Sequence, residues 1–155
     1  MGACLALQLA AEQRCHAAVC INPLAADPDA IDGLMWRKSR GHSWIEVDPS
    51  GVDEIAYERL PIDALIAMTE GVGTVDVMSI DRPVLLVTSV NDAVVDPASS
   101  DVTAAALNRN VRRLFLRHSG HVATLDSERH LVQRATVEFI KTLSDSKDFR
   151  PTRDR

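Results

Sequence analysis

The chain has 155 residues, of which 46% are hydrophobic and 25% charged. This composition predicts one globular domain whose core needs no metal or disulfide cross-links. The net charge of −5 and the aromatic content of 4% argue against nucleic-acid binding, which requires a basic face or stacking rings. Cys4, Cys15 and Cys20 are an odd number of cysteines in apolar stretches. We interpret them as reduced core thiols, which predicts a cytoplasmic protein.

The first eleven residues are apolar from the start of the chain. A secretory signal would carry a basic residue before its apolar run, whereas the charged residues Glu12 and Arg14 follow this run. No other stretch approaches the roughly 18 apolar residues of a membrane span. We therefore predict that residues 2–13 form a buried helix with a polar end, so that the chain starts inside a structural element.

The stretch that follows predicts a strand, an irregular excursion and a helix. Residues 17–21 are a short apolar run closed by an Asn-Pro pair, which predicts a buried strand. Residues 24–57 are interrupted by several Pro and Gly residues, so we expect loops and a short helix there. From Pro61 onward the spacing is helical until two glycines disturb it. The excursion also holds three aromatic rings that either line a pocket or pack it against the body: Trp36, Trp44 and Tyr57.

The second half of the chain alternates strands and helices more regularly. Residues 83–88 are a continuous apolar run, typical of a strand buried on both faces. Residues 111–117 alternate apolar and basic side chains, as an outer strand does. Helices are expected at 98–108 and 128–143, the second with a clear apolar stripe. This alternation predicts an α/β fold in which helices cover a parallel sheet.

Two loops after predicted strands hold residues that can do chemistry. Asp92 lies in the loop after the 83–88 strand, and His121 lies in the loop after the 111–117 strand. In open parallel sheets these loops form the working edge. A carboxylate and an imidazole there form the orienting half of a nucleophilic triad. The carboxylate holds the histidine tautomer, and the histidine accepts the proton of the nucleophile.

Other polar residues of these loops have structural interpretations. Asp96 and Asp126 each precede a predicted helix, so we interpret both as helix caps. His118 stands three residues before His121, but no Cys or His pair at zinc spacing accompanies it. No metal site is therefore predicted.

The ordered motifs Pro-Val-Leu-Leu-Val, Asn-Asp-x-Val-Val-Asp-Pro and Ser-Gly-His-x-x-x-Leu-Asp resemble the C-terminal part of α/β-hydrolases. The carboxylesterase and monoacylglycerol lipase branch is the part of that superfamily they look most like. The resemblance implies that Asp92 is the triad acid and His121 the triad base. The start of the chain resembles the segment directly after the nucleophile in a Gly-x-Ser-Met-Gly elbow, so Met1 takes the family position of an oxyanion-hole donor. Residues 24–60 fall where the family inserts a small lid.

The implied activity is hydrolysis of carboxylic esters, such as short or medium acyl esters or monoacylglycerols, by a serine hydrolase. His121 would act as general base and then acid, Asp92 would orient it, and no cofactor would be needed. The expected partner is a small-molecule ester substrate, with neither nucleic acid nor a membrane span involved. The sequence leaves the oligomeric state open.

The nucleophile is the element for which the chain offers no good candidate. In this fold the serine precedes the acid, and the family position for it is one residue before Met1. We therefore expect residues 1–143 to be the C-terminal part of a domain whose nucleophile-bearing half is absent, followed by a flexible charged tail at 144–155. Ser43 and Cys4 imitate parts of an elbow, but neither has the required strand before it. The alternatives are a catalytically inactive truncated remnant and a small α/β binding module.

Overall fold

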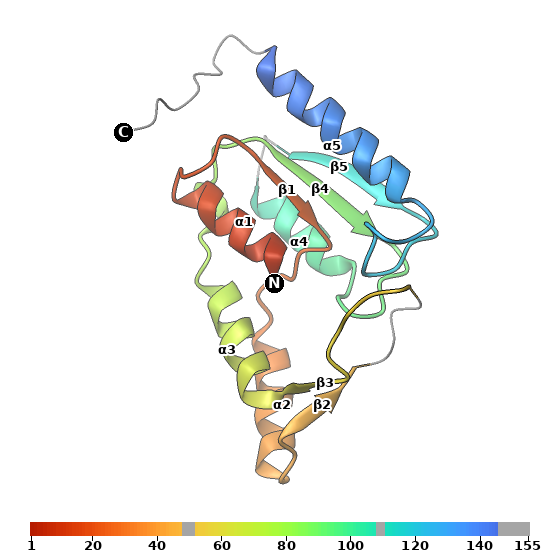
Figure 1. Ribbon diagram of the computed structural model, residues 1–155. Helices are drawn as coiled ribbons and strands as arrows, with labels where there is room; N and C mark the ends of the chain where they lie inside the picture. The colour runs from red at the N-terminus through yellow and green to blue at the C-terminus, as the bar shows by residue number, and fades with distance from the viewer. Residues whose placement is uncertain (48–51, 108–110, 146–155) are drawn as a thin grey trace.

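A computed structural model describes residues 1–47, 52–107 and 111–145 (Figure 1). Its centre is a parallel sheet of three strands in the order β1-β4-β5. The strands are β1 (Ala18–Ile21), β4 (Val84–Ser89) and β5 (Val111–Leu116). Because all three are parallel, their carboxyl ends meet at one edge of the sheet. The predicted α/β class, the parallel sheet and the outer position of the last strand are confirmed.

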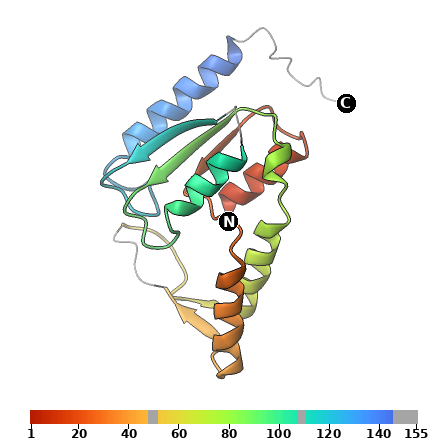
Figure 2. The same ribbon diagram turned by 180° about the vertical axis from the view of Figure 1, so that it is seen from behind.

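The central strand β4 explains the layered arrangement. All six of its residues are buried, and successive side chains point to opposite faces. Val84 and Leu86 belong to a core cluster with Leu7 and Leu107, whereas Leu85 and Val87 pack with Phe139. Helices α1 (Gly2–Ala11) and α4 (Ala98–Ala106) therefore cover one face, and α5 (Arg129–Ser144) covers the other (Figures 1 and 2).

The N-terminal helix is only half buried. Its buried residues are Cys4, Leu7 and Ala10, whereas Leu5 and Leu9 are exposed on the opposite side. The prediction of a helix is confirmed, but the prediction that it is buried holds for one face only. An apolar sequence shows no contrast between faces, so it gives no sign of which face the sheet covers.

The three cysteines are free. Cys4 and Cys20 are buried and Cys15 is half-buried. Burial raises the pKa of the Cys20 thiol to about 12, because desolvation penalises the thiolate. No helix within the described residues combines the length and the apolar character needed to cross a bilayer.

A second part of the chain projects beyond the carboxyl edge of the sheet (Figures 1 and 2). This projecting unit consists of helix α2 (Pro28–Ser39), the antiparallel strands β2 (Trp44–Glu46) and β3 (Arg59–Pro61), and helix α3 (Ile62–Gly73). Loops and a short helix were expected in its first half. The structure has a helix of 12 residues there, followed by the short strand β2, which was not predicted. The Asp27 side chain starts this helix by accepting the Asp29 N–H at 3.0 Å.

Candidate active site

Asp92 and His121 meet at the carboxyl edge of the sheet. Asp92 lies three residues after the end of β4, and His121 lies five residues after the end of β5. Asp92 Oδ2 and His121 Nδ1 are 2.8 Å apart, which is hydrogen-bond distance. The two residues that the sequence singled out are thus partners in space, although 29 positions separate them in the chain.

Both oxygens of the Asp92 carboxylate have hydrogen-bond partners. Oδ1 accepts the N–H groups of Val94 at 2.8 Å and Val95 at 2.9 Å, and Oδ2 faces the imidazole. The Asp92 side chain is 1% exposed, whereas that of His121 is 33% exposed. A carboxylate can only accept, so the hydrogen of the neutral ring lies on Nδ1 and Nε2 is left as the accepting atom. This is the tautomer that a general base needs.

A buried carboxylate, Glu128, fixes the loop before His121. Its Oε2 accepts the N–H groups of His118 at 2.8 Å and Ser119 at 2.9 Å, together with the Ser119 hydroxyl at 3.0 Å. Its Oε1 accepts the N–H of Arg117 at 3.2 Å. Burial by itself raises the pKa of Glu128, but these donated hydrogen bonds outweigh it and hold the pKa below its ordinary value.

A second carboxylate, Asp126, holds the next residue of the same loop. Its Oδ2 accepts the N–H of Gly120 at 2.8 Å, and its Oδ1 accepts the N–H of Ser127 at 2.6 Å. The Gly120 N–H contributes most to lowering the pKa of this carboxyl. The interpretation of Asp126 as a helix cap is wrong, because α5 begins three residues later and has no side-chain cap. Asp96 does accept the N–H of Ala98, the first residue of α4, as expected of a cap.

Asn22 connects the end of β1 to both loops. Its Oδ1 accepts the N–H of Ser89 at 2.8 Å. Its Nδ2 donates to Ser89 Oγ at 3.1 Å and to the carbonyl of His121 at 2.9 Å. The sequence does not predict this role, because an Asn-Pro pair after a strand is typical of an ordinary turn. The role of Glu128 was not predicted for a similar reason, since an acidic residue at a helix start is common.

Two cavities adjoin His121 on the side of the projecting unit. The larger has a volume of about 430 Å³ and is lined by Ile45, Leu60 and Val94 together with Gly120 and His121. The smaller, of about 240 Å³, shares Leu60, Val94 and His121 and adds Tyr57. The walls are largely apolar side chains, so the space beside the imidazole suits an apolar group. All three aromatic residues of this region are exposed, and of them Tyr57 lines the smaller cavity.

Met1 lies at the same edge of the sheet. It precedes α1, and a hydrogen bond from Cys20 Sγ to the Ala3 carbonyl joins the first turn of that helix to β1. Its assignment as an oxyanion-hole donor stays a prediction, as do the catalytic roles of Asp92 and His121.

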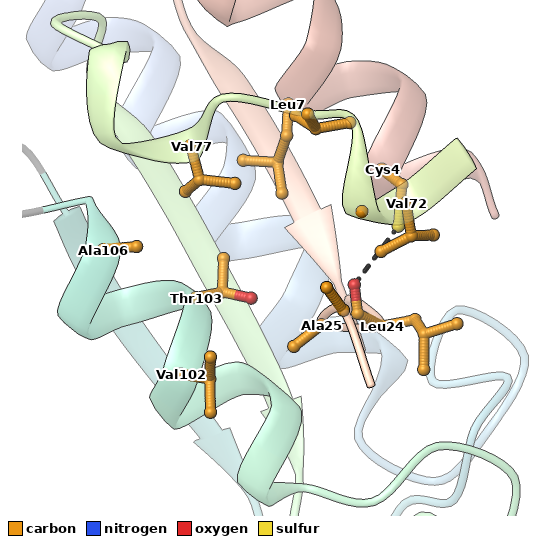
Figure 3. A pocket seen from close by; sticks show the side chains of 12 residues that line it. Cys4, Leu7, Leu24, Ala25, Val72, Val77, Val102, Thr103 and Ala106 are labelled. Carbon is orange, nitrogen blue, oxygen red and sulfur yellow. Dashed lines mark hydrogen bonds between the residues drawn. The ribbon is translucent and has the colours of Figure 1, made fainter. Parts of the chain in front are cut away.

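The two residues that imitate a nucleophile elbow sit in other settings. Ser43 is exposed and precedes strand β2, so the strand-to-helix turn of an elbow is not formed there. Cys4 is buried in α1, donates to the Leu24 carbonyl at 3.4 Å, and lines a separate cavity of about 140 Å³ (Figure 3). His118 contributes its backbone N–H to the Glu128 carboxylate. Within the described residues, no group of three or more His, Cys, Asp or Glu residues could hold a metal ion.

Comparisons with known proteins agree on one fold. The thermostable monoacylglycerol lipase of Bacillus sp. (strain H-257) is 30% identical over 92 residues, which is 57% of this chain and 36% of that lipase. A structure from a study of LipS and LipT, two metagenome-derived lipolytic enzymes, matches 92% of this chain with a TM-score of 0.77 and 25% identity. Mouse alpha/beta hydrolase domain-containing protein 10 matches 91% with a TM-score of 0.66 and 17% identity. No protein-family model matches the chain.

The sheet order, the two loops and these matches define the class: the chain has the fold of the α/β-hydrolases and is similar to members of that superfamily. Within it, the chain is similar to lipolytic enzymes, among them a monoacylglycerol lipase. The chain spans 36% of that lipase, 62% of the LipS and LipT structure and 59% of the mouse protein.

Proposed function

We propose that this chain supplies the acid and the base of a serine-type hydrolase of carboxylic esters. The observation that carries the proposal is the 2.8 Å contact between Asp92 Oδ2 and His121 Nδ1. In that role, Nε2 of His121 takes the proton from the attacking hydroxyl and later gives it to the leaving alcohol. Asp92 keeps the imidazole in the required tautomer and stabilises the imidazolium that forms.

The nucleophile in this proposal is a serine in a longer form of the protein, at the family position just before Met1. The backbone N–H of Met1 then becomes an amide that faces the developing oxyanion. Support comes from the start of α1, which packs against the carboxyl end of β1 through Ala3 and Cys20. Within the described residues, the imidazole of His121 makes its hydrogen bond with Asp92, which leaves Nε2 for such a serine.

The cavities support the substrate class that we propose. The space beside His121 is bounded by Ile45 and Leu60 of the projecting unit and by Val94 of the Asp92 loop. We assign the projecting unit the role of a lid over an acyl group of short or medium length. Removing apolar surface of this kind from water gains about 25 cal/mol per Å², so longer acyl chains bind more tightly until the cavities are full.

The first experiment reads the coding sequence upstream for an in-frame Gly-x-Ser and expresses the longer protein. We expect it to hydrolyse p-nitrophenyl esters and to be labelled by a fluorophosphonate at that serine. His121→Ala should lower kcat/KM by about 10³-fold or more, because the base is lost. His130→Ala removes an exposed histidine of α5 and should leave kcat/KM unchanged.

The proposal fails if His121→Ala and His130→Ala hydrolyse the ester at the same rate. A stop codon directly before Met1 would overturn the position of the nucleophile. Hydrolysis by the 155-residue chain alone that is lost with His121→Ala would also overturn the proposed position of the nucleophile. It would still support the roles of Asp92 as acid and His121 as base.

A further inference from the structure

We propose that Asn22 is a positioning residue that sets the geometry of the Asp92–His121 pair by holding both loops to the end of β1. This inference deepens the proposed function and rests on it for its catalytic meaning. It concerns a buried side chain at the end of β1 that hydrogen-bonds both to Ser89, where the Asp92 loop begins, and to the His121 backbone. Asn22 is 6% exposed, and its side-chain hydrogen bonds go to Ser89 and to the His121 carbonyl, not to the Asp92 carboxylate or the His121 ring.

On the aspartate side, Asn22 acts through Ser89. The Asn22 side chain accepts a hydrogen bond from the Ser89 N–H through Oδ1 and donates one to the Ser89 hydroxyl through Nδ2. The Ser89 carbonyl in turn accepts the N–H of Asp92 at 3.3 Å. Ser89 is completely buried, so the point at which the Asp92 loop leaves β4 is fixed relative to β1.

On the histidine side, Asn22 acts on the backbone of the base itself. Its Nδ2 donates to the carbonyl of His121 at 2.9 Å. The ring of the same residue faces Asp92 from the other end. The two partners of the 2.8 Å contact are therefore tied to one amide group, and a shift of that amide changes their separation.

The requirements of this position are specific to asparagine. One side chain must accept one hydrogen bond and donate two, which an amide does and a carboxylate at neutral pH cannot. Asn22 also has φ of 48°, in the left-handed region that asparagine and aspartate tolerate better than other residues with a Cβ. Its own N–H donates to the Val87 carbonyl at 2.9 Å, so this backbone conformation begins directly where β1 ends.

Two substitutions separate the side chain from the backbone. Asn22→Asp keeps the shape and the tolerance for positive φ, but turns an oxygen toward the His121 carbonyl. Asn22→Gly keeps the positive φ without strain and removes the side chain. Gln13→Gly is the matched control for relief of positive φ, because Gln13 has φ of 55° and is exposed. Thr69→Ala is the control for general loss of stability, because it removes a buried hydroxyl that donates to the Leu65 carbonyl.

The measurement is the exchange rate of the His121 Nδ1 hydrogen with solvent, followed by NMR on the 155-residue chain labelled with ¹⁵N. In the native chain we expect this hydrogen to be protected by Asp92. Asn22→Asp and Asn22→Gly should each accelerate its exchange by about tenfold, the effect of losing roughly one hydrogen bond. Gln13→Gly and Thr69→Ala should leave the rate unchanged, even where Thr69→Ala lowers the melting temperature as much.

Ser89→Ala provides a milder variant in case the Asn22 variants fail to fold. It removes one of the three hydrogen bonds and should accelerate exchange by a smaller factor. Equal exchange rates in the native chain and in every folded Asn22 or Ser89 variant would overturn the positioning role.

The same spectra separate this inference from the proposed function. A native His121 Nδ1 hydrogen without protection would overturn both, because the pair would not form in solution. Protection that depends on Asn22, in a longer protein that does not hydrolyse esters, would support the positioning role and overturn the proposed function alone.

Discussion

The sheet with its covering helices and the projecting unit are held together in different ways. Both core clusters belong to the sheet and its helices, whereas α2 of the projecting unit has no buried residue. In the projecting unit α3 buries Ile62 and Thr69, and exposed contacts such as the Lys38–Asp63 ion pair and the Arg59 side chain over the Trp44 ring join its elements. Exposed contacts of this kind each contribute about 1 kcal/mol or less. The Asp92–His121 pair therefore lies on the region that contains both core clusters, and the cavity wall opposite it belongs to the projecting unit, which buries fewer side chains.

Truncating a core aromatic should give the largest effect and show the contrast directly. Phe139 is 3% exposed and packs against β4, whereas Trp36 is 63% exposed on α2. We expect Phe139→Ala to lower the free energy of unfolding by about 4 kcal/mol and Trp36→Ala to change it by at most about 0.5 kcal/mol. Urea unfolding monitored by circular dichroism measures both. A loss of similar size in the two variants would show that the projecting unit shares the core.

Substitution of Glu128 should give the second-largest loss of stability, although Glu128 is a charged residue. Glu128→Gln leaves one oxygen and places an amide against the N–H groups of His118 and Ser119. Buried donors left without an acceptor make the variant less stable, by about 3 kcal/mol. The matched control is Glu138→Gln, the same change at an exposed position of α5. If both variants unfold at the same urea concentration, the hydrogen bonds to Glu128 do not stabilise the loop.

The pH dependence of Glu128 has a definite sign. Its pKa in the folded chain lies below the ordinary value of 4.5, so the folded state favours the ionised form. The stability gained this way is fully present above the unfolded pKa and is lost as the pH falls through the lowered, folded pKa. As the pH falls below about 4.5, the native chain should therefore lose more stability than the Glu128→Gln variant. Parallel stability curves for the two chains would contradict this.

The same contrast explains how much could be predicted from the sequence. The unbroken apolar run of β4 and the stripe on α5 predict buried elements, because burial leaves a local pattern in these segments. Asp92 and His121 were singled out because each lies in the loop after a predicted strand, β4 and β5. A short helix was expected within residues 24–57, but the bounds of α2 were not predicted because they depend on the Asp27 cap and on contacts with α3 rather than on an apolar stripe. Asn22 and Glu128 were missed because their partners, Ser89 and the 117–119 backbone, are distant in the chain or carry no side-chain signal.

The smallest expected effect tests whether the projecting unit opens on its own. Asp27→Ala removes the side-chain acceptor for the Asp29 N–H at the start of α2, which stabilises a helix by about 1 kcal/mol. If α2 opens locally, the backbone N–H groups of α2 should exchange about fivefold faster in the variant, while those of β4 keep their native rate. Asp32→Ala, within the same helix and without a capping bond, is the control. Faster exchange in both α2 and β4 would mean that the two regions unfold together, so that the projecting unit would open only with the sheet that carries Asp92 and His121.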